Sequence, residues 1–173
     1  SGYAGTSYDI SNYLRYGKEN TLVVRVDATQ YEGWFYEGAG IYRHVWLNQY
    51  NPVHLDESPV FVHTVVQNNN ATVYIETTVQ NESYSNAGVS VSAIITDRDG
   101  NRIAETNTTR VSLGSGEEKT IKQSLKISNP RLWSLEDPYL YRVIPVLRSG
   151  DRIIDTDKWR FGIRTIDVTT KGI

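Results

Sequence analysis

The feature that most constrains the fold is a series of short, evenly spaced runs in which apolar and polar residues alternate. Seven such runs follow one another between residues 60 and 163, with turn-forming residues between them. Successive side chains of a β-strand point to opposite faces, so a period of two indicates strands buried on one face. The predicted strands are 60–67, 72–80, 87–96, 102–113, 120–127, 139–147 and 152–163.

The composition of the turns and the absence of cysteine narrow the fold further. Residues 97–101 (Asp-Arg-Asp-Gly-Asn) and 149–151 (Ser-Gly-Asp) are typical of hairpin turns. No α-helix of ordinary length is visible, and the chain has no cysteine, which excludes disulfides and thiolate metal sites. The sequence therefore predicts an all-β chain with an immunoglobulin-like β-sandwich that lacks the usual disulfide.

The first 56 residues carry fewer strand signals. Leu22, Val24 and Val26 alternate with polar neighbours, a second strand is predicted over residues 42–50, and residues 10–14 are expected to form one helical turn ended by Gly17. Two strands are too few to close a sandwich, so we expect missing partners upstream. A domain boundary is predicted at residues 56–59, where charge and Pro59 interrupt the apolar pattern.

An aromatic loop at residues 31–47 contains two tryptophans, one phenylalanine and three tyrosines around Gly38-Ala39-Gly40. Glycine suits a backbone with positive φ, and flanking rings can fix such a loop by buried area. One interpretation is a structural corner with its rings in the core. The other is that some rings face a sugar. Residue types do not decide between them.

The loop also carries a resemblance. Gly38, Gly40 and residues 41–43 (Ile-Tyr-Arg) match a signature near the end of the N-terminal sugar-binding jelly-roll domain of glycoside hydrolase family 2. Three further stretches agree in the same order: residues 8–14 with 17–20 and 22–27, residues 129–134 with Pro138, Leu140 and Tyr141, and residues 161–164. The chain resembles bacterial β-galactosidases over essentially its whole length.

The resemblance implies a domain plan. Residues 1–56 resemble the incomplete end of the jelly-roll (galactose-binding-like) domain, 57–166 the immunoglobulin-like domain, and 167–173 the start of a connection to a TIM barrel. Family members carry both catalytic glutamates on that barrel, so we expect no catalytic residue here. The chain is interpreted as a non-catalytic scaffold whose partners are the barrel, carbohydrate through the parent enzyme, and a second copy by self-association. A periplasmic or secreted location in bacteria is favoured.

Individual site residues follow from the same comparison. The candidates for substrate contact in the parent enzyme are Glu32, Trp34 and Tyr36, because an acidic residue flanked by aromatic side chains resembles a sugar-binding site. Arg43 is expected to form a hydrogen-bonded pair with Asp27 that pins the loop.

Trp133 precedes the sixth predicted strand. It is interpreted as core or domain-interface packing rather than as a carbohydrate platform.

Other chemistries find no support. His44, His54 and His63 are scattered, so no metal site or cofactor is expected. Serine nucleophile elbows and phosphate loops are absent. A net charge of −2 does not indicate a basic surface for nucleic-acid binding, and no apolar run has the length of a membrane span. The alternative to an enzyme scaffold is a stand-alone carbohydrate-binding or adhesive β-sandwich.

Overall fold

The computed structural model describes residues 5–27 and 40–166, which belong to two compact units. The first unit ends at Leu47, and the second begins at Asn48. In the first unit a 3-10 helix, η1 (Ser11–Tyr13), confirms the predicted helical turn. The Asp9 carboxylate begins this turn by accepting a hydrogen bond of 2.8 Å from the Ser11 N–H, and Gly17 follows it with a φ of +71°.

The two strands predicted for this first part are wrong. Residues 22–26 and 42–50 have no regular secondary structure, and Leu22, Val24 and Val26 are all more than half exposed. A strand needs a hydrogen-bonded neighbour and a surface on which to bury its apolar face. The described residues of this unit form no strand at all, so an alternating pattern is not sufficient to produce one.

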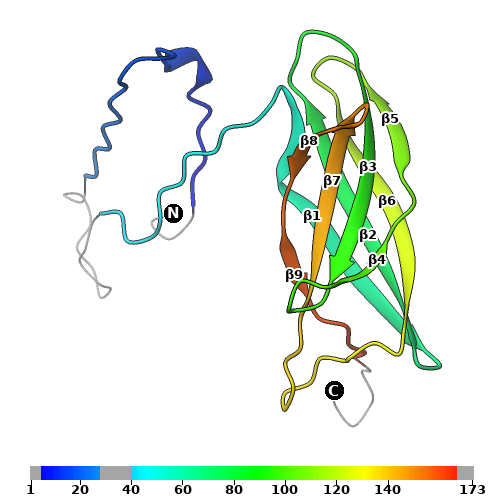
Figure 1. The fold of residues 1–173 in the computed structure, drawn as a ribbon. Helices are drawn as coiled ribbons and strands as arrows, with labels where there is room; N and C mark the ends of the chain where they lie inside the picture. Colours follow the sequence, from blue (N-terminus) through cyan, green and yellow to red (C-terminus); the bar gives the residue numbers. More distant parts are fainter. Residues whose placement is uncertain (1–4, 28–39, 167–173) are drawn as a thin grey trace. The chain divides into compact units, whose positions relative to one another are not determined.

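The second unit is a sandwich of two antiparallel sheets (Figure 1). The three-stranded sheet has the order β1-β2-β6, with β1 at Val53–Gln67, β2 at Asn70–Asn81 and β6 at Glu118–Ser128. The six-stranded sheet has the order β4-β3-β7-β8, and in addition β5 pairs with β3 and β9 with β7. Its strands are β3 (Ala87–Thr96), β4 (Arg102–Glu105), β5 (Thr109–Leu113), β7 (Tyr141–Ser149), β8 (Arg152–Thr156) and β9 (Trp159–Phe161).

The core lies between the two sheets. One cluster packs Val73 and Ile75 of β2 against Ile95 and Val143 of the other sheet, and a second gathers around Leu147. These side chains are the ones that the alternation directs inward. The described part of the chain contains no α-helix, so the all-β prediction is confirmed, and two facing antiparallel sheets are consistent with the immunoglobulin-like sandwich of the prediction.

Two predicted strands are each divided in the structure. The run 102–113 forms β4 and β5, which both pair with β3, and the run 152–163 forms β8 and β9, which both pair with β7. Between β4 and β5, the Thr106 hydroxyl accepts the Ala93 N–H at 2.9 Å, and the Thr106 N–H donates to the Ala93 carbonyl. A side chain thus replaces one ladder bond and breaks the strand.

The predicted boundary at residues 56–59 lies inside β1. The pairing of β1 with β2 shifts its register there, between Leu55 and Val60. The domain limits themselves stay a prediction.

Candidate functional site

The candidate sugar contacts lie outside the described residues. Glu32, Trp34, Tyr36 and Gly38 all fall in the segment 28–39. Their role in the parent enzyme stays a prediction.

The rest of the loop motif is described. Gly40 has a φ of +144°, a conformation that other residues rarely adopt. The Arg43 guanidinium lies over the Tyr42 ring at 5.3 Å, and Asp27 pairs with Arg25 at 3.3 Å. The pair between Asp27 and Arg43 stays a prediction.

Trp133 is fixed against the end of β9. It lies in the connection from β6 to β7, and its N–H donates to the Ile163 carbonyl at 2.8 Å. The Arg164 guanidinium covers its ring at 5.1 Å. A Cβ on Gly162 would lie only 3.1 Å from the Cβ of Trp133, so glycine at residue 162 lets the indole pack here without a shift of either segment. The motif residues around 133 and 162 are thus parts of one cluster.

A second set of contacts holds the same connection. Arg131 forms two hydrogen bonds with Asp137, at 2.6 and 3.0 Å, and its guanidinium lies 4.5 Å from the Tyr139 ring centre. The Arg131 N–H donates to the Tyr141 hydroxyl at 2.8 Å. The Asp137 carboxylate raises the pKa of Arg131, and burial raises the pKa of Tyr141. The connection is therefore a braced segment rather than a loose loop.

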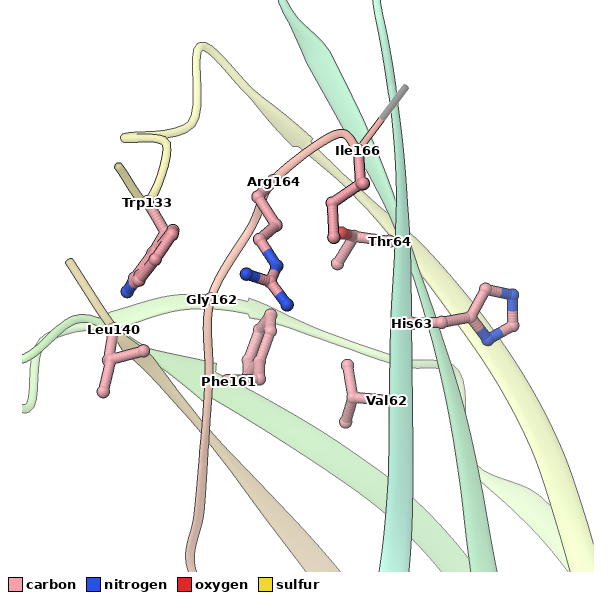
Figure 2. A pocket seen from close by; sticks show the side chains of 9 residues that line it. All are labelled: Val62, His63, Thr64, Trp133, Leu140, Phe161, Gly162, Arg164 and Ile166. Carbon is pink, nitrogen blue, oxygen red and sulfur yellow. The ribbon is translucent and has the colours of Figure 1, made fainter. Parts of the chain in front are cut away.

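Trp133, Gly162 and Arg164 line one side of a groove of about 640 Å³ (Figure 2). Val62 and Thr64 of β1 face Trp133, Leu140 and Phe161 across it, and the Arg164 guanidinium points into the space between them. His63 points away from the groove in Figure 2, because its ring stacks on Tyr74 at 4.7 Å on the outer face of the sheet. Apolar and polar atoms contribute about equally to the groove surface, and Arg164 is the one cation among its described lining residues.

The chemistry that this groove can perform is limited. Among the described residues no carboxylate lines it, whereas glycoside hydrolysis needs two carboxyl groups across the bond that is cleaved. Two acidic residues in turns of the sandwich form other contacts. Asp137 pairs with Arg131, and the Glu117 carboxylate accepts a hydrogen bond of 2.6 Å from the Gly114 N–H, which lowers the pKa of Glu117. The described side chains of the groove are suited to binding.

Among the described residues there is neither a candidate metal site nor a helix that could span a membrane. Residues 5–27 and 40–166 contain no group of three histidines or acids that could hold a metal ion. His54 is buried and its Nδ1 lies 3.0 Å from the Asn51 carbonyl, while His44 is exposed. In the same ranges no helix has the length and hydropathy needed to span a membrane.

Reasoning from the sequence singled out Trp133 but assigned no contact to Gly162 or Arg164. About thirty residues separate them from Trp133, and only the course of the chain from β6 through β7 and β8 to β9 brings them together. The glycine between Phe161 and Ile163 was the available signal, because a glycine inside a strand pattern often marks a close approach of another group.

The fold and the groove define a β-sandwich domain with a candidate binding site. Comparison with known proteins identifies its family. Residues 53–164 match the family model described as "Glycosyl hydrolases family 2". The chain therefore belongs to glycoside hydrolase family 2.

Individual relatives agree with this assignment. The β-galactosidase BoGH2A of Bacteroides ovatus is 34% identical over 98% of this chain, and a β-glucuronidase of Formosa agariphila is 28% identical over 96%. The crystal structure of a family 2 member from Bacteroides cellulosilyticus is 32% identical and superposes over 94% of this chain and 22% of its own, with a TM-score of 0.86. The chain spans about a fifth of the length of the curated relatives it matches.

Proposed function

We propose that this chain is the non-catalytic scaffold portion of a family 2 glycosidase, with residues 1–56 belonging to a sugar-binding jelly roll and 57–166 forming the immunoglobulin-like domain. The single observation that carries the proposal is the groove. Apolar side chains from β1, β9 and the braced connection surround one exposed guanidinium, Arg164, just where the chain leaves the sandwich. A groove that combines apolar side chains with a cation and other polar groups suits protein docking.

The occupant of the groove is the catalytic portion of the parent enzyme. Among the described residues Arg164 has a ring contact with Trp133 but no carboxylate within ion-pair distance. An acidic side chain of the catalytic portion would complete the site, and the apolar walls would bury its neighbours. The groove would thereby orient the sandwich against that portion.

The parent reaction is proposed as β-galactoside hydrolysis. The β-galactosidase is the more similar of the two relatives described above, at 34% against 28% identity. Glu32, Trp34 and Tyr36 are proposed to shape one side of the substrate pocket from the aromatic loop.

The first test is to determine the reading frame beyond the codon for Ile173. We expect several hundred residues with alternating strands and helices and two glutamates at strand ends. A stop within a few codons would overturn the scaffold proposal and leave the stand-alone carbohydrate-binding protein as the alternative.

The second test uses activity. The full-length enzyme should hydrolyse p-nitrophenyl β-D-galactopyranoside faster than the corresponding glucuronide, whereas the 173-residue chain should hydrolyse neither. In the full-length enzyme Arg164→Gln should lower the melting temperature of the catalytic portion, and Lys158→Gln, which removes a charge outside the groove, should not. A preference for the glucuronide would contradict the proposed substrate while leaving the scaffold role intact.

A further inference from the structure

Two arginines flank a serine on the outer face of the six-stranded sheet. Ser90 of β3 lies directly opposite Arg110 of β5 on one side and opposite Arg148 of β7 on the other. Strands β5 and β7 lie on either side of β3 in this part of the sheet (Figure 1). Directly opposed residues of antiparallel strands point to the same face, and Val91 and Leu147, the neighbours in sequence of this row, are buried in the core. The side chains of both arginines therefore leave the backbone on the outer face of the sheet.

The row forms the floor and sides of a hollow of about 670 Å³. Gly88 and Ser90 keep the floor low, and a Cβ added at Gly88 would meet no atom within 4 Å. The hydroxyl-bearing residues Thr108 and Ser112 also line the hollow. Neighbouring strands lie about 4.8 Å apart, so the Cα atoms of the two arginines are about 10 Å apart, and their side chains can converge on one group above Ser90.

The arginines have few acceptors of their own. Arg148 donates from Nη1 to the Ser92 hydroxyl at 3.4 Å, and that hydroxyl donates to Glu105 at 3.2 Å, which itself pairs with Arg102. Asp151 is the one carboxylate among the described residues that line the hollow. Within the described ranges neither Arg110 nor Arg148 has a carboxylate within ion-pair distance. The hollow thus has an excess of positive charge on a chain of net charge −2.

We propose that this hollow binds an acidic sugar, with the carboxylate held between Arg110 and Arg148. A guanidinium presents parallel N–H donors that match the two oxygens of a carboxylate, and two guanidinium groups can hold one carboxylate from opposite sides. The volume is within the range of small-ligand sites, so it has room for a pyranose ring as well as the anion. Thr108, Ser90 and Ser112 supply partners for ring hydroxyls. The site is on the sheet opposite β1, the strand that lines the groove, and the inference stands without the proposed function.

The test is a titration of the 173-residue chain with methyl β-D-glucuronide, followed by amide chemical shifts. Changes should saturate with a Kd of about 1 mM and be confined to residues 88–90, 108–112 and 148–151. The uncharged methyl β-D-glucoside tests the carboxylate, and sodium sulfate tests an oxyanion without a sugar. Both should bind at least about tenfold more weakly.

Three variants locate the binding. Arg110→Gln and Arg148→Gln should each weaken binding of the glucuronide about tenfold, whereas Lys158→Gln, the same loss of charge outside the hollow, should leave the affinity unchanged. Arg110→Gln should melt no lower than the wild type, because it removes one of two like charges, whereas Arg148→Gln also removes the donor to the Ser92 hydroxyl and should melt slightly lower. Equal weakening by all three variants, or equal affinity for the glucoside, would overturn the carboxylate site. Sulfate binding as tight as that of the glucuronide would overturn the role of the sugar ring.

Discussion

The first unit and the sandwich contain the same alternating pattern but use it differently. Leu22 is 69% exposed in a segment without regular structure, whereas Leu147 is fully buried in β7. The difference is the pairing: β7 has β3 on one side and β8 and β9 on the other, whereas the described part of the first unit contains no strand at all. An alternating pattern therefore predicts which face of a strand would be buried. Whether the strand forms depends on the presence of neighbouring strands with which it can pair.

The comparison extends to polar anchors. Asn20 in the first unit holds a turn by accepting the Arg15 N–H and donating to the Arg15 and Lys18 carbonyls, all in exposed positions. Asn81 in the sandwich makes similar bonds but is 1% exposed. Water competes for the hydrogen bonds of Asn20 in the first unit, whereas the sandwich shields those of Asn81 from water.

The largest expected effect comes from truncating matched leucines. Leu147→Ala should lower the free energy of unfolding of the sandwich by about 3 kcal/mol, because it removes a fully buried side chain and leaves a cavity. Leu22→Ala should change it by less than about 0.5 kcal/mol. Urea unfolding followed by near-UV circular dichroism measures both. A large effect of Leu22→Ala would show that the first unit buries this side chain in solution.

The paired asparagines give the next effect. Asn81→Ala should destabilise the sandwich by about 2 kcal/mol, because it leaves the carbonyls of Ser85 and Gly114 without their buried donor. Asn20→Ala should leave the same unfolding curve unchanged within about 0.5 kcal/mol. If the two variants were equally destabilising, shielding from water would not be the cause.

The burial of Asn81 also excludes it as a glycan acceptor, although Asn81-Glu82-Ser83 has the sequon pattern.

A smaller effect distinguishes the glycines. Gly162→Ala should cost the sandwich about 1 to 2 kcal/mol, because the added Cβ would press on Trp133 at 3.1 Å. Gly5→Ala, with nothing within 4 Å of the added atom, should be neutral. Tryptophan fluorescence should report a moved indole only in the first variant. An unshifted spectrum together with unchanged stability would contradict the close packing of Trp133 on residue 162.

Much of the sandwich could be predicted from the sequence, because its signals are local. The run 87–96 is the observed β3 residue for residue, and the turn at 97–101 forms as expected, with the Asp97 N–H donating to the Asn101 carbonyl at 3.0 Å. The division into β4 and β5 was not predictable in this way, because it depends on the contact of Thr106 with Ala93 on another strand.

The candidate sites were less accessible to such reasoning. Trp133, Gly162 and Arg164 are recognisable as motif residues, but their contact depends on the order of strands in space. The Arg110–Ser90–Arg148 row depends on the register of three strands, which a single sequence does not specify. Local patterns thus predict elements, and pairing places side chains from distant elements together.

The smallest effect is a pH dependence. Hydrogen bonds from the Asn101 side chain, and from the N–H groups of Asp99 and Asn101, lower the pKa of Asp97. A carboxyl group whose pKa is lower in the folded protein stabilises the fold above its unfolded pKa of about 3.9, and that contribution is lost as the pH falls through the folded value. Asp97→Asn should therefore lower the melting temperature slightly at pH about 7, with the difference vanishing near pH about 2.

The matched acid is Asp9 in the first unit. Hydrogen bonds from Ser11 also lower the pKa of Asp9, but they lie in a helical turn outside the sandwich. Asp9→Asn should therefore leave the melting of the sandwich unchanged at every pH. Melting curves of both variants across the acid range test this. If Asp9→Asn showed the same pH-dependent loss as Asp97→Asn, the two units would unfold together, and the contrast between them would hold for the folded structure but not for its stability.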